Sequence, residues 1–327
     1  MKICFSTLAC PNSDWTEIYS MAKDLSFDGI EIRGLGEDIS AVKAKPFTDA
    51  QLPETVKKLS ELGLTIPCLS SGCVLKNREN QEQITEEISA YITLAGKLNT
   101  PFIRILADAD PAPGGDVDDS YIVEALRALA PLAKAGNVTL LVETNGVYSD
   151  TKRLKQVLDQ VASPFIAALW DMHHPYRYHG ESPYDTIKHL SSYIKYVHTK
   201  DSVMEGDKVQ YKMMGEGSLP LSDMFAALTA QGYDGYVSLE WVKRWSEDLS
   251  DAGVVVPHFA NYMAPYRTRH KHPLQDNRTH TGKYIWPKER LIDYTFPDVL
   301  DRICEEFPNQ YAFRYTELDY TRTYPQF

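Results

Sequence analysis

Residues 138–146 read Val-Thr-Leu-Leu-Val-Glu-Thr-Asn-Gly, a short apolar run that ends abruptly in a carboxylate at Glu143. The same arrangement recurs in FIAALWD at 165–171, IKYVH at 194–198 and YVSLE at 236–240. Each run has the length of a buried strand, and each places one ionisable side chain at its carboxyl end: Glu143, Asp171, His198 and Glu240. The recurrence predicts parallel strands whose last residues meet at one edge.

Eight short apolar runs in the chain alternate with longer amphipathic stretches, which is the pattern of repeated strand–helix units around a parallel sheet. The runs are Lys2–Ser6, Gly29–Arg33, Leu64–Leu69, Phe102–Leu106, Val138–Glu143, Phe165–Asp171, Ile194–His198 and Tyr236–Glu240. The predicted helices between them include Pro53–Leu62, Glu82–Leu98, Tyr121–Ala135, Lys152–Val161 and Leu221–Ala230. The alternative is an open doubly wound sheet, which needs only about six strands. Such a sheet often has a glycine-rich phosphate-binding loop after its first strand, and this sequence has no such loop there. We therefore expect an α/β fold, a (β/α)8 TIM barrel over residues 1–263 with a C-terminal extension.

The composition of the chain argues against some classes of binding partner. A formal net charge of −11 makes nucleic acids and anionic membranes poor partners, and no segment is apolar over the length needed to span a bilayer. The five cysteines form no CxxC pair and are odd in number, which favours a reducing, cytoplasmic location. The sequence leaves the oligomeric state open, and a homo-oligomer is one of the states it allows.

The four strand-end residues Glu143, Asp171, His198 and Glu240 are best interpreted together. A single acid at a strand end is more often a helix cap or an ion-pair partner on the surface. Four ionisable groups on consecutive strands of a barrel converge on one crowded rim, where their desolvation is costly unless a cation is bound. Three carboxylates and one imidazole suit Mn²⁺, Mg²⁺ or Co²⁺, and Zn²⁺ is also compatible.

Further motifs surround these four residues. Asp171-Met172-His173-His174 follows the sixth run and His198-Thr199-Lys200-Asp201 the seventh, and Gly215-Glu216-Gly217 and Tyr233-Asp234-Gly235-Tyr236 come later. With them, the chain over about residues 1–263 resembles the xylose isomerase-like barrel superfamily, in its sugar phosphate isomerase/epimerase branch. The resemblance implies a divalent-metal-dependent isomerase or epimerase that acts on a small polyhydroxylated or sugar-like substrate through an enediolate. It also implies that Glu143 and Glu240 are the catalytic acid/base pair as well as metal ligands.

Six side chains near the predicted rim are candidates for substrate contacts: His174, Arg104, Lys200, Glu31, Arg33 and Glu216. Cationic or imidazole groups at strand ends can orient hydroxyl, carbonyl or carboxylate oxygens. Each candidate could also have a purely structural role. His174, or His173 in its place, would be a surface histidine, Lys200 and Arg104 would pair with Asp201 or another rim acid, and Glu31 with Arg33 would form a structural pair.

Two different functions use much of the same chemistry. A dehydratase of a keto-polyol or of a dehydroshikimate-like acid would form the same enolate and then expel hydroxide. An abasic-site endonuclease of the superfamily would need further His and Asp ligands and a basic DNA path, so it ranks low.

The C-terminal part of the sequence differs from the barrel in character. Residues 264–290 are rich in Arg, His, Lys, Pro and Thr without an apolar period, which predicts a linker. Beyond it we expect a short amphipathic helix from Thr295 and a pair of small strands in Tyr311–Tyr324. Residues 291–327 resemble the opening of an adenylate-forming, AMP-binding ligase domain of the acyl-CoA synthetase type. That resemblance would make the barrel part of a covalent fusion, in which it could also be a non-catalytic substrate-sensing module.

Overall fold

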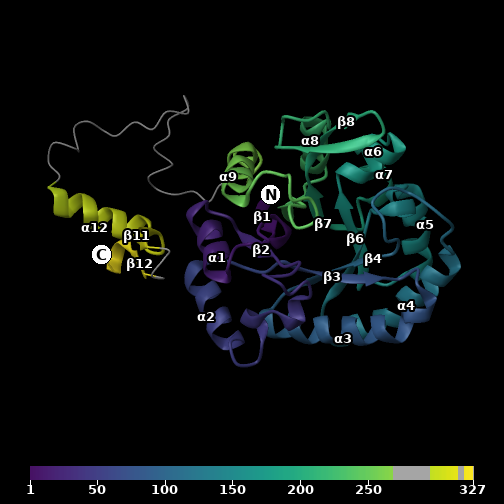
Figure 1. Ribbon diagram of the computed structural model, residues 1–327, viewed down its shortest axis with the longest axis horizontal. Coiled ribbons are helices and arrows are strands. Elements are labelled where there is room, and N and C mark those ends of the chain that lie inside the picture. The colour runs from purple at the N-terminus through teal and green to yellow at the C-terminus, as the bar shows by residue number, and fades with distance from the viewer. Residues whose placement is uncertain (268–294, 316–319, 327) are drawn as a thin grey trace. The chain divides into compact units, whose positions relative to one another are not determined.

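The computed structural model describes residues 1–267, 295–315 and 320–326. The chain divides into a barrel unit that ends at Arg267 and a C-terminal unit. In the barrel unit, eight parallel strands follow the order β2-β1-β10-β7-β6-β5-β4-β3. Isolated parallel bridges from Gly29 to Thr65 and from Ile32 to Leu69 link the segments around β2 and β3, each with one residue just outside the strand, and bring the ring close to closure. The predicted TIM barrel is confirmed (Figure 1).

The barrel strands are β1 Lys2–Ser6, β2 Gly29–Glu31, β3 Cys68–Val74, β4 Phe102–Leu106, β5 Thr139–Glu143, β6 Ile166–Asp171, β7 Ile194–Thr199 and β10 Tyr236–Leu239. Seven of them coincide with the predicted runs to within about two residues at either end. The third is different, because the strand expected over Leu64–Leu69 begins at Cys68 and continues to Val74. Pro67 has no backbone N–H, so the regular ladder begins after it. The strand then continues through Ser70, Ser71 and Gly72. These residues are not apolar, so the apolar pattern of the sequence did not predict this part of the strand.

Helices lie outside the ring of strands, as Figure 1 shows. They are α1 Trp15–Asp24, α2 Leu52–Leu62, α3 Gln81–Leu98, α4 Asp119–Ala135, α5 Thr151–Val161, α6 His173–His179, α7 Pro183–Leu190, α8 Leu221–Ala230 and α9 Ala252–Met263. Three of them begin after an aspartate, Asp14, Asp118 or Asp150, whose side chain accepts hydrogen bonds from the first-turn backbone N–H groups. Such caps satisfy donors that have no partner within the helix.

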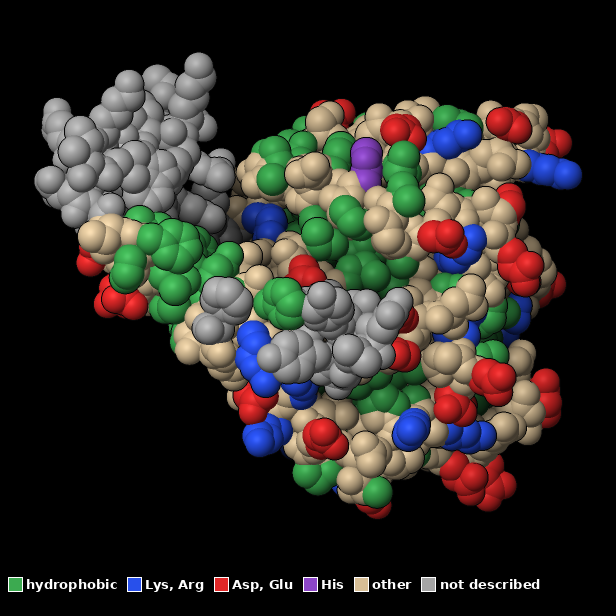
Figure 2. Space-filling model, turned by 60° about the vertical axis from the view of Figure 1, so that its left-hand side comes forward, with side chains coloured by type: hydrophobic (Ala, Val, Ile, Leu, Met, Phe, Trp, Pro, Cys, Tyr) green, Lys and Arg blue, Asp and Glu red, His purple; other side chains and the backbone are tan. Residues whose placement is uncertain are grey.

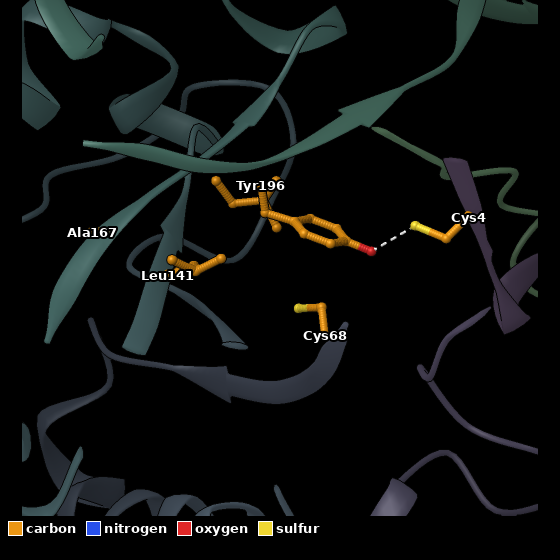
Figure 3. Packing of buried hydrophobic residues seen from close by; sticks show 6 residues of the cluster. Cys4, Cys68, Leu141, Ala167 and Tyr196 are labelled. Carbon is orange, nitrogen blue, oxygen red and sulfur yellow. Dashed lines mark hydrogen bonds between the residues drawn. The ribbon is translucent and has the colours of Figure 1, made fainter. Parts of the chain in front are cut away.

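A layer of side chains fills the barrel interior below its carboxyl-end rim. Cys4, Cys68, Leu141 and Tyr196 come from the first, third, fifth and seventh strands, and all are fully buried (Figure 3). The Tyr196 hydroxyl and the Cys4 thiol are hydrogen-bonded at 3.0 Å. Because side chains alternate across a strand, the inward positions two residues beyond Leu141 and Tyr196 are Glu143 and His198. The apolar layer therefore supports the ionisable groups directly above it.

A short antiparallel hairpin follows β7 and was not predicted. It consists of β8 Asp201–Glu205 and β9 Lys208–Lys212. The Asp201 carboxylate accepts backbone N–H groups from Gly215 at 3.0 Å and Gly217 at 2.9 Å. Gly215 has φ +86°, and a Cβ at Gly217 would lie 2.0 Å from Asp201 Oδ1. Two of the motifs noted in the sequence, His198-Thr199-Lys200-Asp201 and Gly215-Glu216-Gly217, are thus one structural unit.

The C-terminal unit contains the predicted helix and strands. Helix α12 spans Phe296–Glu306 and begins with a capping box between Thr295 and Asp298. Strands β11 Tyr311–Tyr315 and β12 Tyr320–Thr323 pair antiparallel. The relation of this segment to adenylate-forming ligases stays a prediction.

The residues that follow helix α9 are grouped with the barrel, and the predicted domain bounds stay a prediction. Residues 264–267 belong to the barrel unit, where Arg267 lies 3.5 Å from the carboxylate of Asp28. The remainder of the linker predicted for 264–290 lies outside the described residues.

The visible surface carries charges of both signs, and the cysteine side chains are not joined in disulfides. Acidic side chains are dispersed among Lys and Arg on the face of the molecule shown in Figure 2, so they form no broad acidic patch among the coloured residues there. All five cysteines are free thiols. Among the described helices, none combines the length and apolar character needed to cross a membrane.

Candidate metal centre

The structure brings the four strand-end residues together. Glu143, Asp171, His198 and Glu240 each offer one ligand atom, and these four atoms all lie within 4.8 Å of one another. Their side chains are buried, the most exposed being Glu240 at 6%. The strand register explains the grouping, because Asp171 of β6 lies opposite His198 of β7 and Glu240 follows the last residue of β10. The carboxyl ends of four adjacent strands therefore converge on one point, as expected.

Glu31 fixes the ring of His198 from below. Both carboxylate oxygens of Glu31 lie near His198 Nε2, at 3.1 and 3.0 Å. Glu31 also accepts hydrogen bonds from the Ser70 hydroxyl at 2.6 Å and the Tyr196 hydroxyl at 3.2 Å. With Nε2 engaged, Nδ1 of His198 is directed to the other side, where it lies 3.5 Å from Glu143 and 3.3 Å from Glu240.

The protonation of His198 depends on these carboxylates. Burial alone would lower the pKa of His198, but the charges of Glu31 and Glu240 raise it well above its ordinary value. Since metal coordination requires an unprotonated nitrogen, a cation and a proton compete for the same atom of this ring.

Arg104 stabilises the ionised form of the catalytic candidate Glu143. Its Nε lies 3.0 Å from Glu143 Oε2, its Nη2 lies 3.7 Å from Glu240 Oε1, and its Nη1 donates to the Ser71 carbonyl at 3.0 Å. Burial alone would raise the pKa of Glu143, but Arg104 and His198 lower it to about 2. Arg104 therefore forms an ion pair with a rim acid, Glu143, which is the structural role that the sequence left open for it.

Lys200 is the second buried cation of the cluster. Its ammonium group donates to Asp171 Oδ2 and to Glu240 Oε2, and the residue is 1% exposed. Burial alone would lower the pKa of Lys200, but these two carboxylates raise it well above its ordinary value. Lys200 therefore also forms ion pairs with rim acids. Its partners are the candidate metal ligands Asp171 and Glu240, and not Asp201.

His174 faces the cluster from helix α6. The residue is 3% exposed, so it is not a surface histidine. Its Nδ1 donates to the Thr144 carbonyl at 3.0 Å, which leaves Nε2 as an acceptor 3.7 Å from Asp171 Oδ2. The neighbouring His173 is bonded through Nε2 to the Ser202 hydroxyl at 3.0 Å. His174 thus has a ring nitrogen available beside Asp171, and Nδ1 of His173 also lacks a hydrogen bond among the described residues; Asp171, His173 and His174 offer ligand atoms within 4.8 Å of one another.

The remaining candidates lie in three different environments. Glu31 is fully buried and contacts His198, Ser70 and Tyr196, so it supports a candidate ligand and does not line the rim. Arg33 is half-buried, donates to the Ile39 carbonyl at 2.8 Å and lies 5.9 Å from the centre of the Trp245 ring. Glu216 is exposed in the loop that Asp201 holds.

The donor set fits a divalent cation. His198 Nδ1 is buried and has no hydrogen bond of good geometry among the described residues, although it is close to two glutamates. An unused nitrogen that faces carboxylates is what a metal-binding imidazole requires, and the second bond to Glu31 is the usual support for such a ligand. Glu143, Asp171, His198 and Glu240 are the residues that would hold the ion.

Two features of this centre were not apparent from the sequence. The support of His198 by Glu31, and the bridge of Lys200 between Asp171 and Glu240, both depend on which side chains point inward. A period of two along each strand is the signal that could have found them, because Glu31, His198 and Lys200 share the inward parity of their strands.

Comparisons with known proteins agree with this architecture. Residues 20–256 match the family described as Xylose isomerase-like TIM barrel. No curated protein matches the chain. Among solved structures, it is similar to the probable 3-DHS dehydratase AsbF of Bacillus anthracis, with 19% identity over 80% of this chain and 98% of that one, and a TM-score of 0.65.

Two further structures are similar to the same extent. D-psicose 3-epimerase of Clostridium cellulolyticum H10, solved with D-tagatose, has 19% identity over 81% of this chain and 99% of that one, with a TM-score of 0.64. The IOLI protein with a bound zinc atom has 16% identity over 82% of this chain and all of that one, with a TM-score of 0.67. At such identities the likeness shows the fold alone. The match of the family over most of the barrel, together with the observed fold, establishes that this chain belongs to the xylose isomerase-like TIM barrel family.

Proposed function

We propose that this chain is a divalent-metal-dependent isomerase or epimerase of a small, sugar-like polyhydroxylated substrate. The observation that carries the proposal is the convergence of Glu143, Asp171, His198 and Glu240, whose ligand atoms lie within 4.8 Å of one another. Mn²⁺, Mg²⁺, Co²⁺ and Zn²⁺ are all compatible with three carboxylates and an imidazole. The zinc atom in the structure of the IOLI protein, which has a similar fold, supports the choice of a divalent ion.

The bound ion would polarise adjacent substrate oxygens and stabilise the negative charge of an enediolate. Glu143 and Glu240 would move the carbon-bound proton, because both are buried, ionised carboxylates at the rim. Arg104 keeps Glu143 ionised, so this side chain can accept a proton without first losing one to solvent. His174 Nε2, as an acceptor, would orient a substrate hydroxyl, and Arg33 at the rim would contact an oxygen further from the reacting carbon.

A dehydratase is the second candidate function, and the similarity to a probable 3-DHS dehydratase supports it. The same carboxylates would remove the proton, after which a hydroxide would leave and a conjugated double bond would form. The two functions therefore differ in the step after proton removal and not in the residues that begin the reaction.

Proton exchange tests both candidates together. The protein is treated with a chelator, reloaded with Mn²⁺ and incubated in D₂O with keto sugars such as D-tagatose, with inososes and with dehydroshikimate. Deuterium incorporation next to the carbonyl, followed by NMR, supports the shared first step, and a new conjugated absorbance assigns the dehydratase.

Three other outcomes have distinct meanings. Full activity in the chelated protein contradicts metal dependence. Metal binding without exchange on any substrate favours a barrel that is a substrate-sensing module attached to a ligase. Exchange without elimination assigns the isomerase or epimerase.

A further inference from the structure

Lys200 is placed between two of the four candidate metal ligands. Its ammonium group donates to Asp171 Oδ2 and to Glu240 Oε2, from the residue two positions beyond His198. Asp171 and Glu240 are also two of the four residues proposed to hold a divalent ion. The same two carboxylates therefore serve two different cations.

The second oxygens of these two carboxylates have contacts of their own. Asp171 Oδ1 accepts the backbone N–H of His173 at 2.8 Å. Glu240 Oε1 lies 3.3 Å from His198 Nδ1 and 3.7 Å from Arg104 Nη2. A divalent ion that binds through Asp171 Oδ2 must consequently share that oxygen with Lys200, and one that binds through Glu240 Oε1 lies on a carboxylate whose other oxygen Lys200 already holds.

Burial makes this competition strong. Lys200 is 1% exposed and Asp171 is fully buried, so water screens their charges poorly. A lysine ammonium is a compact charge on a flexible stem of four carbons, and it can withdraw from a carboxylate without moving the backbone. A guanidinium held at several points, like that of Arg104, has less freedom to do so.

We propose that Lys200 is a built-in cation that competes with the divalent ion for Asp171 and Glu240 and thereby sets the metal affinity of the centre. The inference rests on the proposed function, because it requires a metal at these residues. It assigns Lys200 a role distinct from substrate contact: the ammonium neutralises the two carboxylates when the ion is absent and weakens binding when it is present.

Lys200→Met is the direct test, since methionine keeps much of the side-chain volume and removes the charge. Calorimetric titration with MnCl₂ should show a dissociation constant about tenfold or more lower than that of the wild type. In chelator, the melting temperature of the variant should fall by about 5 °C or more, because two buried carboxylates lose their partner. Added Mn²⁺ should then raise the melting temperature more in the variant than in the wild type.

Lys76→Met is the matched control. Lys76 lies 2.6 Å from the buried carboxylate of Asp108, a pair that contains none of the four candidate ligands. Its loss should lower stability to the same extent with and without Mn²⁺ and leave the dissociation constant for Mn²⁺ unchanged.

The outcomes separate this inference from the proposed function. Unchanged or weaker Mn²⁺ binding in Lys200→Met overturns the competition while leaving a metal enzyme intact. Tighter binding in the variant alone, with none in the wild type, supports the competition and contradicts the metal dependence of the natural chain. Failure of both proteins to bind Mn²⁺ overturns both proposals.

Two further measurements cover the case in which Lys200→Met does not fold. Lys200→Gln, which keeps a hydrogen-bond donor, should also bind Mn²⁺ more tightly than the wild type. In the wild-type protein, the ¹⁵N resonance of the buried Lys200 ammonium should shift when diamagnetic ZnCl₂ is added. A resonance that does not change while zinc binds overturns the inference without any variant.

Discussion

Both carboxylate oxygens of Glu31 lie within 3.1 Å of His198 Nε2, and neither residue is exposed to solvent. The contact leaves the imidazole one orientation, in which Nδ1 points to Glu143 and Glu240. A ligand whose ring cannot turn loses little freedom when it binds a cation. The affinity of the proposed centre for a metal ion should therefore depend on Glu31, although Glu31 would not contact the ion.

Glu31→Gln should weaken Mn²⁺ binding by about 10- to 100-fold, because a neutral amide is a poorer acceptor for the His198 N–H than a carboxylate. Calorimetric titration with MnCl₂ measures the change. Glu181→Gln is the matched control, since the Glu181 carboxylate accepts hydroxyl hydrogen bonds from Thr151 and Thr186 and lies outside the proposed ligand set. Equal affinity in Glu31→Gln and in the control would contradict the supporting role of Glu31.

Glu240→Gln should reduce the rate of deuterium exchange by about 10²- to 10⁴-fold or more, since the amide cannot act as an acid or base at this position. The far-UV circular dichroism spectrum should stay that of the wild type. Glu124 is exposed on helix α4, and Glu124→Gln controls for the loss of a carboxylate elsewhere. Exchange at the wild-type rate in Glu240→Gln would exclude this residue from proton transfer.

Arg104→Met should lower the free energy of unfolding by about 3–5 kcal/mol near pH 7, because it leaves the buried Glu143 carboxylate without its main partner. The pKa of Glu143 is lowered from 4.5 to about 2 in the folded protein, so its stabilising effect is present above pH 4.5 and is lost as the pH falls towards 2. Without Arg104 this pKa rises, so the stability difference between wild type and variant should narrow as the pH is lowered.

Urea denaturation in chelator, from about pH 6 to about pH 3, measures that difference for Arg104→Met. Arg127 is exposed on α4, and Arg127→Met should give a small difference that does not vary with pH. A difference for Arg104→Met that stays constant over the same range would show that Glu143 does not depend on this guanidinium.

Gly217→Ala should lower the free energy of unfolding by about 1–3 kcal/mol, because the added methyl group would lie 2.0 Å from Asp201 Oδ1. Faster hydrogen exchange in β8 and β9 should accompany the loss, since Asp201 joins the hairpin to the glycine loop. Gly96→Ala is a control of opposite sign. Gly96 lies in helix α3 with nothing within 4 Å of the new methyl group, so this variant should be more stable by about 0.5–1 kcal/mol. Similar effects of the two substitutions would refute the steric explanation.

The barrel fold and the convergence of the four candidate ligands could both be predicted from the sequence. Glu143, Asp171, His198 and Glu240 each end or follow an apolar run, and parallel strands in a barrel bring such ends to one rim. Only the third strand was displaced, because Pro67 moved its start and small polar residues carried it further.

The contacts between these residues could not be predicted in the same way. Whether Lys200 pairs with Asp201 or with Asp171 depends on strand parity, and a shift of one residue reverses the side to which every side chain points. Glu31 and His198 are 167 positions apart, so no local pattern joins them. The hairpin β8–β9 was missed because its strands are largely polar, without the apolar run that marked the barrel strands.

The apolar layer of Cys4, Cys68, Leu141 and Tyr196 has a further consequence for chemistry above it. It fills the barrel interior below the ionisable groups, so reactants and water would have to reach the proposed centre from the rim. A proton taken from a substrate by Glu143 or Glu240 has no exit through the floor. The rate at which a proton on Glu143 or Glu240 exchanges with D₂O would therefore depend on how fully a bound substrate covers the rim.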